Sequence, residues 1–147
     1  MFLPKKNNQW IQALLSKPEG IQLDFKQNIS NQKKIAKTSL AFANTEGGVA
    51  VVGVADNKQI TGIDPEEEMY MAKEAVRKFC KPEINLTFDV YEIYEKSEND
   101  QLLEKYILVI HVPKSNDQLH ALKTQGEPPV YYKRIKDRSI PFQTNQG

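Results

Sequence analysis

Two short runs of the sequence are apolar on both faces of a strand, and they constrain the fold more than any other feature. The first is VAVVGV at 49–54, and the second is KYILVIHV at 105–112. A strand with apolar side chains on both faces has to lie inside a sheet that is covered on both sides. We therefore expect the strands at 49–55 and 105–112 to be the central strands of the fold.

Helical patterns flank these strands. From about Ser30 to Asn44 apolar residues recur at helical spacing, and Ser30 is the expected N-cap. Asp64 and Pro65 begin a second helix, near 65–81, with three glutamates in its first turn. With a shorter N-terminal helix around Trp10, the pattern predicts an α+β fold, a mixed α/β two-layer arrangement with a mixed sheet and flanking helices.

Strict alternation of apolar and polar residues predicts two half-buried strands, at 21–26 and 84–90, and a slip of phase at 91–93 indicates a bulge. In the first strand, alternation puts Asp24 and Lys26 together on the face away from the core. A last, basic strand is expected in VYYKRI at 130–135.

The chain has 147 residues, which is enough for one domain with a real core. We expect a single domain over 1–147, and the sequence leaves open whether it is part of a longer regulator. No apolar run approaches the roughly 20 residues that cross a bilayer, so no membrane partner is expected. The single cysteine, Cys80, is expected to be a small core residue, and a reducing cytoplasm fits it best.

Net charge is only +1, but the charges are segregated along the chain. Two separate segments are rich in cations and poor in acids, and a fold that brought them together would form a basic face. The alternative is that these cations are ordinary surface residues. The cations concerned are Lys26, Lys33, Lys34, Lys37, Lys133, Arg134, Lys136 and Arg138.

Three carboxylates are the other candidates for chemistry. Glu19 precedes the first strand, Asp24 lies within it, and Asp56 ends the first central strand. Carboxylates that converge from neighbouring strands can hold Mg²⁺ or Mn²⁺, and Lys26 could then stabilise charge on a phosphate. The alternative is that the three acids are solvated strand ends. Of the histidines, His111 is expected in the core and His120 in a polar loop.

The sequence from LDFKQN through SLAFANTEGGVAVVGVADNKQITGID resembles the Schlafen AlbA-like domain, also called the divergent AAA domain. The family pattern is carboxylate-Phe-Lys, then A-F-A-N-T-x-G-G, then an apolar strand with a glycine and a terminal aspartate. The segments IHVPKSNDQLH and VYYKR extend the resemblance over roughly residues 10–138. Three departures stand out, namely Asp24 in place of glutamate, Leu119 in place of proline and Lys136 in place of glycine.

The resemblance implies a DNA-binding module of the kind found in prokaryotic transcriptional regulators. Some vertebrate members cleave RNA with three acids and a divalent metal, and those acids correspond to Glu19, Asp24 and Asp56. An Mg²⁺- or Mn²⁺-dependent endoribonuclease is therefore one alternative function. Nucleotide (ATP) binding is another, although the chain has no phosphate-binding loop of the G-x-x-x-x-G-K-[ST] type. Nuclease-type members surround a basic groove with two lobes, so we expect this single lobe to form a homo-oligomer.

Overall fold

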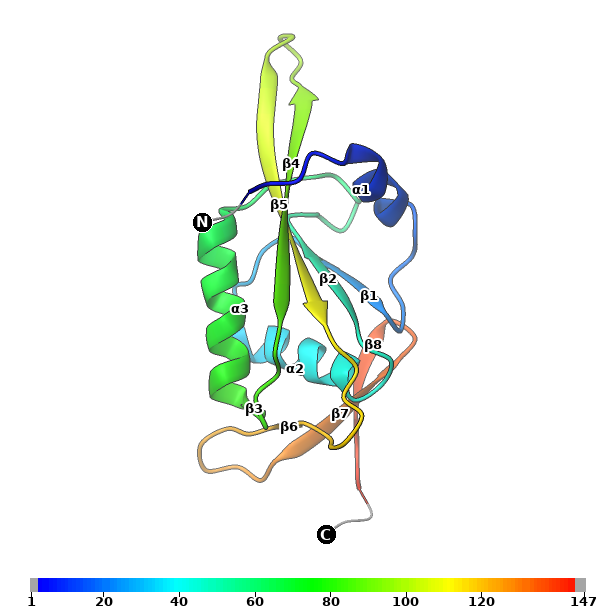
Figure 1. The fold of residues 1–147 in the computed structure, drawn as a ribbon, viewed down its shortest axis with the longest axis vertical. Coiled ribbons are helices and arrows are strands. Elements are labelled where there is room, and N and C mark those ends of the chain that lie inside the picture. Colours follow the sequence, from blue (N-terminus) through cyan, green and yellow to red (C-terminus); the bar gives the residue numbers. More distant parts are fainter. Residues whose placement is uncertain (1–2, 145–147) are drawn as a thin grey trace.

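The computed structural model describes residues 3–144, which form three helices and eight strands (Figure 1). The bounds of the elements are α1 Asn8–Leu15, β1 Leu23–Lys26, α2 Gln32–Ala43, β2 Gly48–Val52, α3 Pro65–Phe79, β3 Cys80–Lys81, β4 Thr87–Lys96, β5 Leu102–Val112, β6 Ala121–Leu122, β7 Val130–Ile135 and β8 Arg138–Phe142.

The first sheet has the strand order β1-β2-β5-β4, so the two doubly apolar strands are its central ones, as predicted. β1 runs parallel to β2, and the other neighbours are antiparallel. The mixed α+β fold is therefore confirmed. β2 ends at Val52, earlier than predicted, and beyond it an isolated bridge pairs Val54 with Ile60.

Each face of this sheet carries its own hydrophobic core. Helices α2 and α3 cover one face, where Leu40, Leu108 and Ile110 are fully buried. Helix α1 covers part of the other face, and Trp10 stacks on Tyr91 there with ring centroids 5.0 Å apart. None of the helices in residues 3–144 has the length and apolar character required to cross a membrane.

The second sheet has the order β3-β6-β7-β8, and α2 lies between the two sheets. Of these strands only β7 was predicted. β3 and β6 are two residues long, too short for periodicity to reveal. β8 pairs with β7 through a tight turn in which Lys136 has a φ of 56°, a backbone conformation that asparagine and glycine favour. The sequence pattern therefore predicted only one of the two strands of this hairpin.

The N-cap differs from the prediction in one helix and agrees with it in the other. The N-cap of α2 is Asn31 rather than Ser30, because the Asn31 side chain accepts from the backbone N–H of Lys34. Asp64 caps α3 as predicted, accepting from Glu66 and Glu67.

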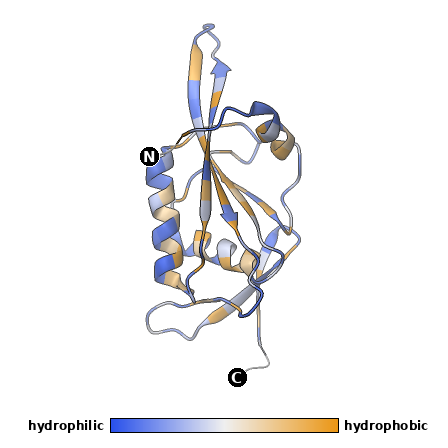
Figure 2. Ribbon diagram, in the orientation of Figure 1, coloured by the Kyte–Doolittle hydropathy of each residue, from blue (hydrophilic) through white to orange (hydrophobic). Residues whose placement is uncertain are grey.

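β4 contains no bulge where one was predicted, since its register with β5 is continuous from Thr87 to Lys96. The phase of its sequence slips because the buried face changes along the strand. Phe88 and Val90 pack toward α2 and α3, whereas Tyr91 and Ile93 pack toward α1. Beyond this point the β4–β5 hairpin projects from the body as an arm, with Leu102 64% exposed near its tip (Figures 1 and 2).

Candidate functional site

The carboxylate predicted to lie on a solvated face is buried. Asp24 lies on the face of β1 that faces α2 and the second sheet, and only 7% of it is exposed. Its Oδ1 accepts from Nη2 of Arg134 at 3.0 Å, and its Oδ2 lies 3.1 Å from Nζ of Lys26. Alternation therefore placed Asp24 and Lys26 on one face correctly but assigned that face to solvent. The sequence carried no sign that an arginine 110 positions later covers it.

Glu19 joins this cluster from the loop before β1. Its Oε2 accepts from the backbone N–H of Phe25 at 2.9 Å. Partial burial raises the pKa of Glu19 above its usual value, and the neighbouring Asp24 adds to the rise. Burial would also raise the pKa of Asp24. The charge of Lys26, a hydrogen bond with Glu19 and the contact with Arg134 together lower this pKa instead. Glu19 is thus the carboxyl of the pair that keeps its proton longer as pH rises.

The third predicted acid is not part of this cluster. Asp56 lies in the exposed turn after Val54. Within residues 3–144 no group of three histidine, cysteine, aspartate or glutamate side chains could hold a metal ion. Both Asp24 oxygens already face cations, whereas Mg²⁺ and Mn²⁺ need lone pairs directed at the ion. The donor set present does not fit the divalent metal that the resemblance implies, because the turn carries Asp56 away while Arg134 neutralises Asp24.

The cations of the first segment gather around the start of α2. Lys26 and Lys34 line one hollow with a volume of about 190 Å³. Lys33 and Lys34 are exposed, and no acid lies in the first turn of α2. Lys37 is half-buried, with its Nζ 5.0 Å from the ring centroid of Tyr132 on β7. α2 and β7 therefore lie side by side, as the predicted basic face requires.

The second segment divides between two faces of β7. Arg134 points inward and is 4% exposed, so its assignment to a basic surface is wrong. It is held there by Asp24 and by the carbonyls of Gly20 and Leu23. Lys133 points to the opposite face, and Lys136 and Arg138 are exposed at the β7–β8 turn. The eight cations therefore do not form one continuous face.

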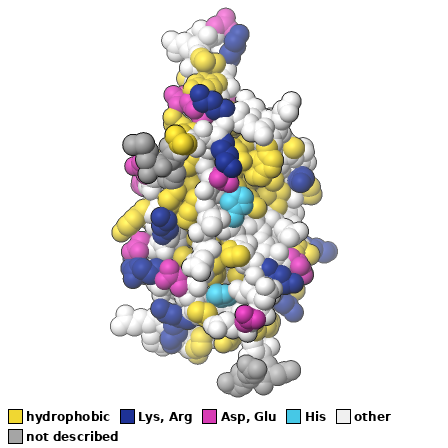
Figure 3. Space-filling view, in the orientation of Figure 1, with side chains coloured by type: hydrophobic (Ala, Val, Ile, Leu, Met, Phe, Trp, Pro, Cys, Tyr) yellow, Lys and Arg dark blue, Asp and Glu magenta, His cyan; other side chains and the backbone are white. Residues whose placement is uncertain are grey.

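The two histidines differ from the prediction in how far they are buried. His120 lies in the loop before β6, as predicted, but is buried there, with Nε2 2.5 Å from Oγ of Ser115 and Nδ1 2.6 Å from the carbonyl of Pro82. His111 is only half-buried, because the face of β5 that carries it is not covered by α1 at this level. Its Nε2 lies 2.9 Å from Oδ2 of Asp89, and Lys5 is 3.2 Å from the other carboxylate oxygen. Figure 3 shows a histidine beside an acidic and a basic side chain on this face.

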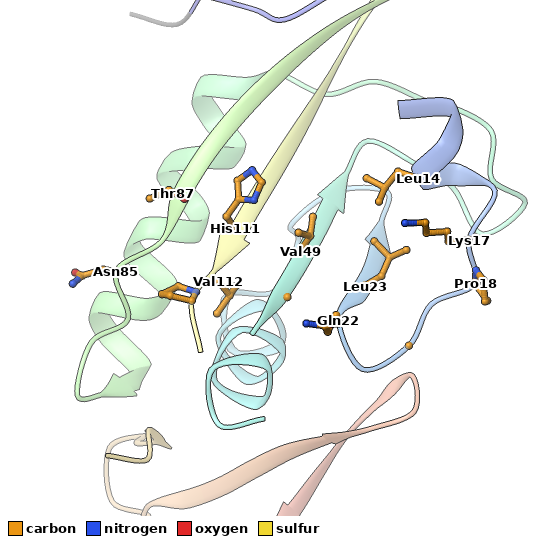
Figure 4. Close-up of a pocket in the computed structure, with 13 residues that line it drawn as sticks. Leu14, Lys17, Pro18, Gln22, Leu23, Val49, Asn85, Thr87, His111 and Val112 are labelled. Atoms are coloured by element: carbon orange, nitrogen blue, oxygen red, sulfur yellow. The ribbon is translucent and has the colours of Figure 1, made fainter. Parts of the chain in front are cut away.

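His111 borders a hollow that sequence reasoning did not find. The hollow has a volume of about 710 Å³ and lies on the sheet face beside α1 (Figure 4). Its lining is mainly apolar and includes Leu14, Leu23, Val49 and Val112. No periodicity could reveal it, because it results from α1 being too short to cover the whole face.

The A-F-A-N-T-x-G-G segment is a structural junction. The Asn44 side chain donates from Nδ2 to the carbonyls of His120 and Tyr132 and accepts from the backbone N–H of His120, all within 2.9 Å. Thr45 Oγ1 accepts from the backbone N–H of Arg134 at 2.8 Å. Gly47 has a φ of 73°, and a Cβ there would lie 2.9 Å from backbone atoms of Val112 and Lys114. These residues join α2 to the second sheet and set the position of Arg134.

Comparisons with known proteins support the mixed α+β fold. A family model described as Schlafen, AlbA_2 matches residues 19–143. The chain is also similar to the crystal structure of the DIP2311 protein from Corynebacterium diphtheriae, with a TM-score of 0.53 and 14% sequence identity. The match covers 90% of this chain and 25% of that protein, so this chain spans about a quarter of its length. At this identity the likeness concerns the fold alone.

Proposed function

Because the chain belongs to the Schlafen AlbA_2 family, we propose that it binds nucleic acid, with DNA as the expected partner and transcriptional regulation as the expected role. Family membership supports a nucleic-acid-related domain. The observation that carries the proposal is a set of cations without acidic partners. Within residues 3–144, six of the eight predicted cations form no ion pair, namely Lys33, Lys34, Lys37, Lys133, Lys136 and Arg138.

Unpaired surface cations suit a polyanion. Lysine and arginine side chains that contact phosphates release condensed counterions, which makes affinity independent of sequence and strongly dependent on salt. The three unpaired lysines of α2 and the three exposed cations of β7–β8 would contact phosphates on two separate surfaces. Asp24 and Arg134 act indirectly, since their ion pair fixes β1 against β7.

The test is a titration of labelled duplex DNA by fluorescence anisotropy at two salt concentrations. We compare the wild type with the double variant Lys33→Gln/Lys34→Gln. Loss of two phosphate contacts should weaken binding at low salt and reduce the slope of log affinity against log salt by about 2.

The matched control is Lys73→Gln/Lys96→Gln, which removes two other exposed lysines. It changes net charge equally, and Lys73 lies 5.8 Å from an aromatic ring as Lys33 lies 5.9 Å from one. Equal weakening in both double variants would show that only net charge matters. Absence of duplex binding at low salt would rule out duplex DNA as the partner, and absence of binding to any nucleic acid would refute the proposed function.

A further inference from the structure

The side of the β7–β8 hairpin that faces away from α2 carries aromatic and basic side chains together. Tyr132 packs toward the core and Arg134 toward Asp24, so alternation directs the intervening residues of β7 outward. Residues paired across the hairpin point to the same side. We call this surface the outer face, and from the pairing register it consists of Tyr131, Lys133, Ile135, Arg138, Ile140 and Phe142.

Two rings form one end of this surface. Tyr131 pairs with Phe142 across the strands, with ring centroids 6.1 Å apart and planes inclined by 52°. Both side chains are half-buried. Nζ of Lys133 lies 5.4 Å from the centroid of the Phe142 ring, so a cation stands directly beside the aromatic pair.

Two hollows with space for a ligand border the rings. One hollow of about 710 Å³ is bordered by Tyr131, Phe142 and Leu119, and Leu119 is itself 41% exposed. A second hollow of about 590 Å³ is bordered by the same two rings together with Pro129 and Pro141. Both rings therefore line two depressions, each of which could receive a flat group against a ring.

The charge of the outer face selects an anionic partner. Its six residues include two exposed cations, Lys133 and Arg138, and no acid, while Lys136 lies at the adjoining turn. Two acids lie nearby. Asp117 borders the hollow that Leu119 also lines, and Asp137 lies in the turn between β7 and β8. An apolar surface built for a neutral protein partner would not need cations beside its rings.

We infer that the outer face binds single-stranded nucleic acid, with bases stacked on Tyr131 and Phe142 and phosphates contacted by Lys133 and Arg138. This inference rests on the proposed function and specifies the form of the ligand. A duplex keeps its bases stacked inside and offers a sheet surface only its backbone, so the rings and hollows would have no partner. A single strand exposes the face of each base, and stacking of this kind tolerates any sequence.

The experiment compares three ligands of one sequence in anisotropy titrations: a single-stranded DNA of about 12 nucleotides, within the range that one small fold covers, its RNA counterpart and the DNA duplex. The test variant is Phe142→Leu, which removes a ring and keeps an apolar side chain. The control is Phe88→Leu, a half-buried ring on β4 that also has a lysine near it. Melting temperatures of both variants report any loss of folding.

We expect Phe142→Leu to weaken binding of a single strand about tenfold or more and to leave duplex binding unchanged. The control Phe88→Leu should leave the binding of both ligands unchanged. Stronger loss with RNA or with DNA identifies the strand recognised. Equal affinity for single strand and duplex, with no effect of Phe142→Leu, overturns the inference and leaves the proposed function standing. Self-association that Phe142→Leu abolishes in light scattering also overturns it, because the face would then bind protein. No binding of any strand at low salt refutes both.

Discussion

Arg134 donates from Nη2 to Oδ1 of Asp24 over 3.0 Å, and the two residues are only 4% and 7% exposed. The same guanidinium donates from Nε to the carbonyl of Gly20 at 2.9 Å. β7 of the second sheet is thereby attached to β1 of the first. A charged pair in this position is buried between the sheets, so each partner depends on the other.

We predict that Arg134→Met destabilises the fold by about 3–5 kcal/mol, because it leaves the buried Asp24 carboxylate with Lys26 alone. Urea denaturation followed by circular dichroism measures the loss. The double variant Asp24→Asn/Arg134→Met should cost clearly less than the sum of the two single changes. Additive costs would mean that the two residues act independently.

Asn44→Asp should destabilise the protein by roughly 2–4 kcal/mol. The change replaces a donor to two carbonyls with an oxygen that repels them. The measurement is the same denaturation, and Asn99→Asp in the exposed β4–β5 turn is the matched control. Similar costs at the two sites would contradict the junction assigned to Asn44.

Gly48→Ala is expected to cost about 1–3 kcal/mol, since the new methyl group would lie 2.6 Å from the ring of Phe42, which is fully buried. Gly20→Ala is the control, because a Cβ there has no neighbour within 4 Å among the described residues. Thermal melting of the two variants should separate them by several degrees. If they melt together, the Phe42 ring adapts at little cost.

The buried Glu68 should make stability fall as pH rises above 4.5. Burial raises the pKa of Glu68 above 4.5 although its carboxylate accepts from the N–H of Ile29, so the folded state holds this proton longer than the unfolded chain. The stability of Glu68→Gln relative to wild type should therefore increase between pH 4.5 and neutrality. A pH series of denaturation curves measures the difference, and a constant difference would contradict the raised pKa.

Asp24 should affect the pH dependence of stability in the opposite direction to Glu68. Its pKa is lowered in the folded state, so the stability it contributes is present above pH 3.8 and is lost as pH falls through the lowered value. In the same pH series, the stability advantage of wild type over Asp24→Asn should decrease as pH falls below 3.8.

The elements buried on both faces were predictable, because burial leaves a local trace in hydropathy. β2, β5 and α3 with its Asp64 cap follow from their own residues. β8 was missed because its partner strand and turn, rather than its own alternation, determine it. The phase slip in β4 was misread as a bulge because hydropathy shows which face is buried but not which helix buries it.

The candidate site was predictable in its residue types and not in its contacts. The proximity of Asp24 to Lys26 follows from strand geometry, whereas Arg134 reaches Asp24 through a tertiary contact that spans 110 positions. Asp56 was placed at the end of the strand, but the strand ends at Val52 and a turn carries the carboxylate to solvent. The local sequence pattern indicates neither the contact of Arg134 with Asp24 nor the end of the strand at Val52.

The stack of Trp10 on Tyr91 decides what an optical experiment on this protein can observe. Trp10 is the only tryptophan in the chain, and α1, which carries it, buries only Ile11 fully. Indole emission will therefore follow the detachment of one short helix, while the ellipticity comes mainly from α2 and α3. If α1 leaves the sheet first, emission will change at a lower urea concentration than ellipticity, and a two-state fit to emission alone will understate the stability of the remaining fold.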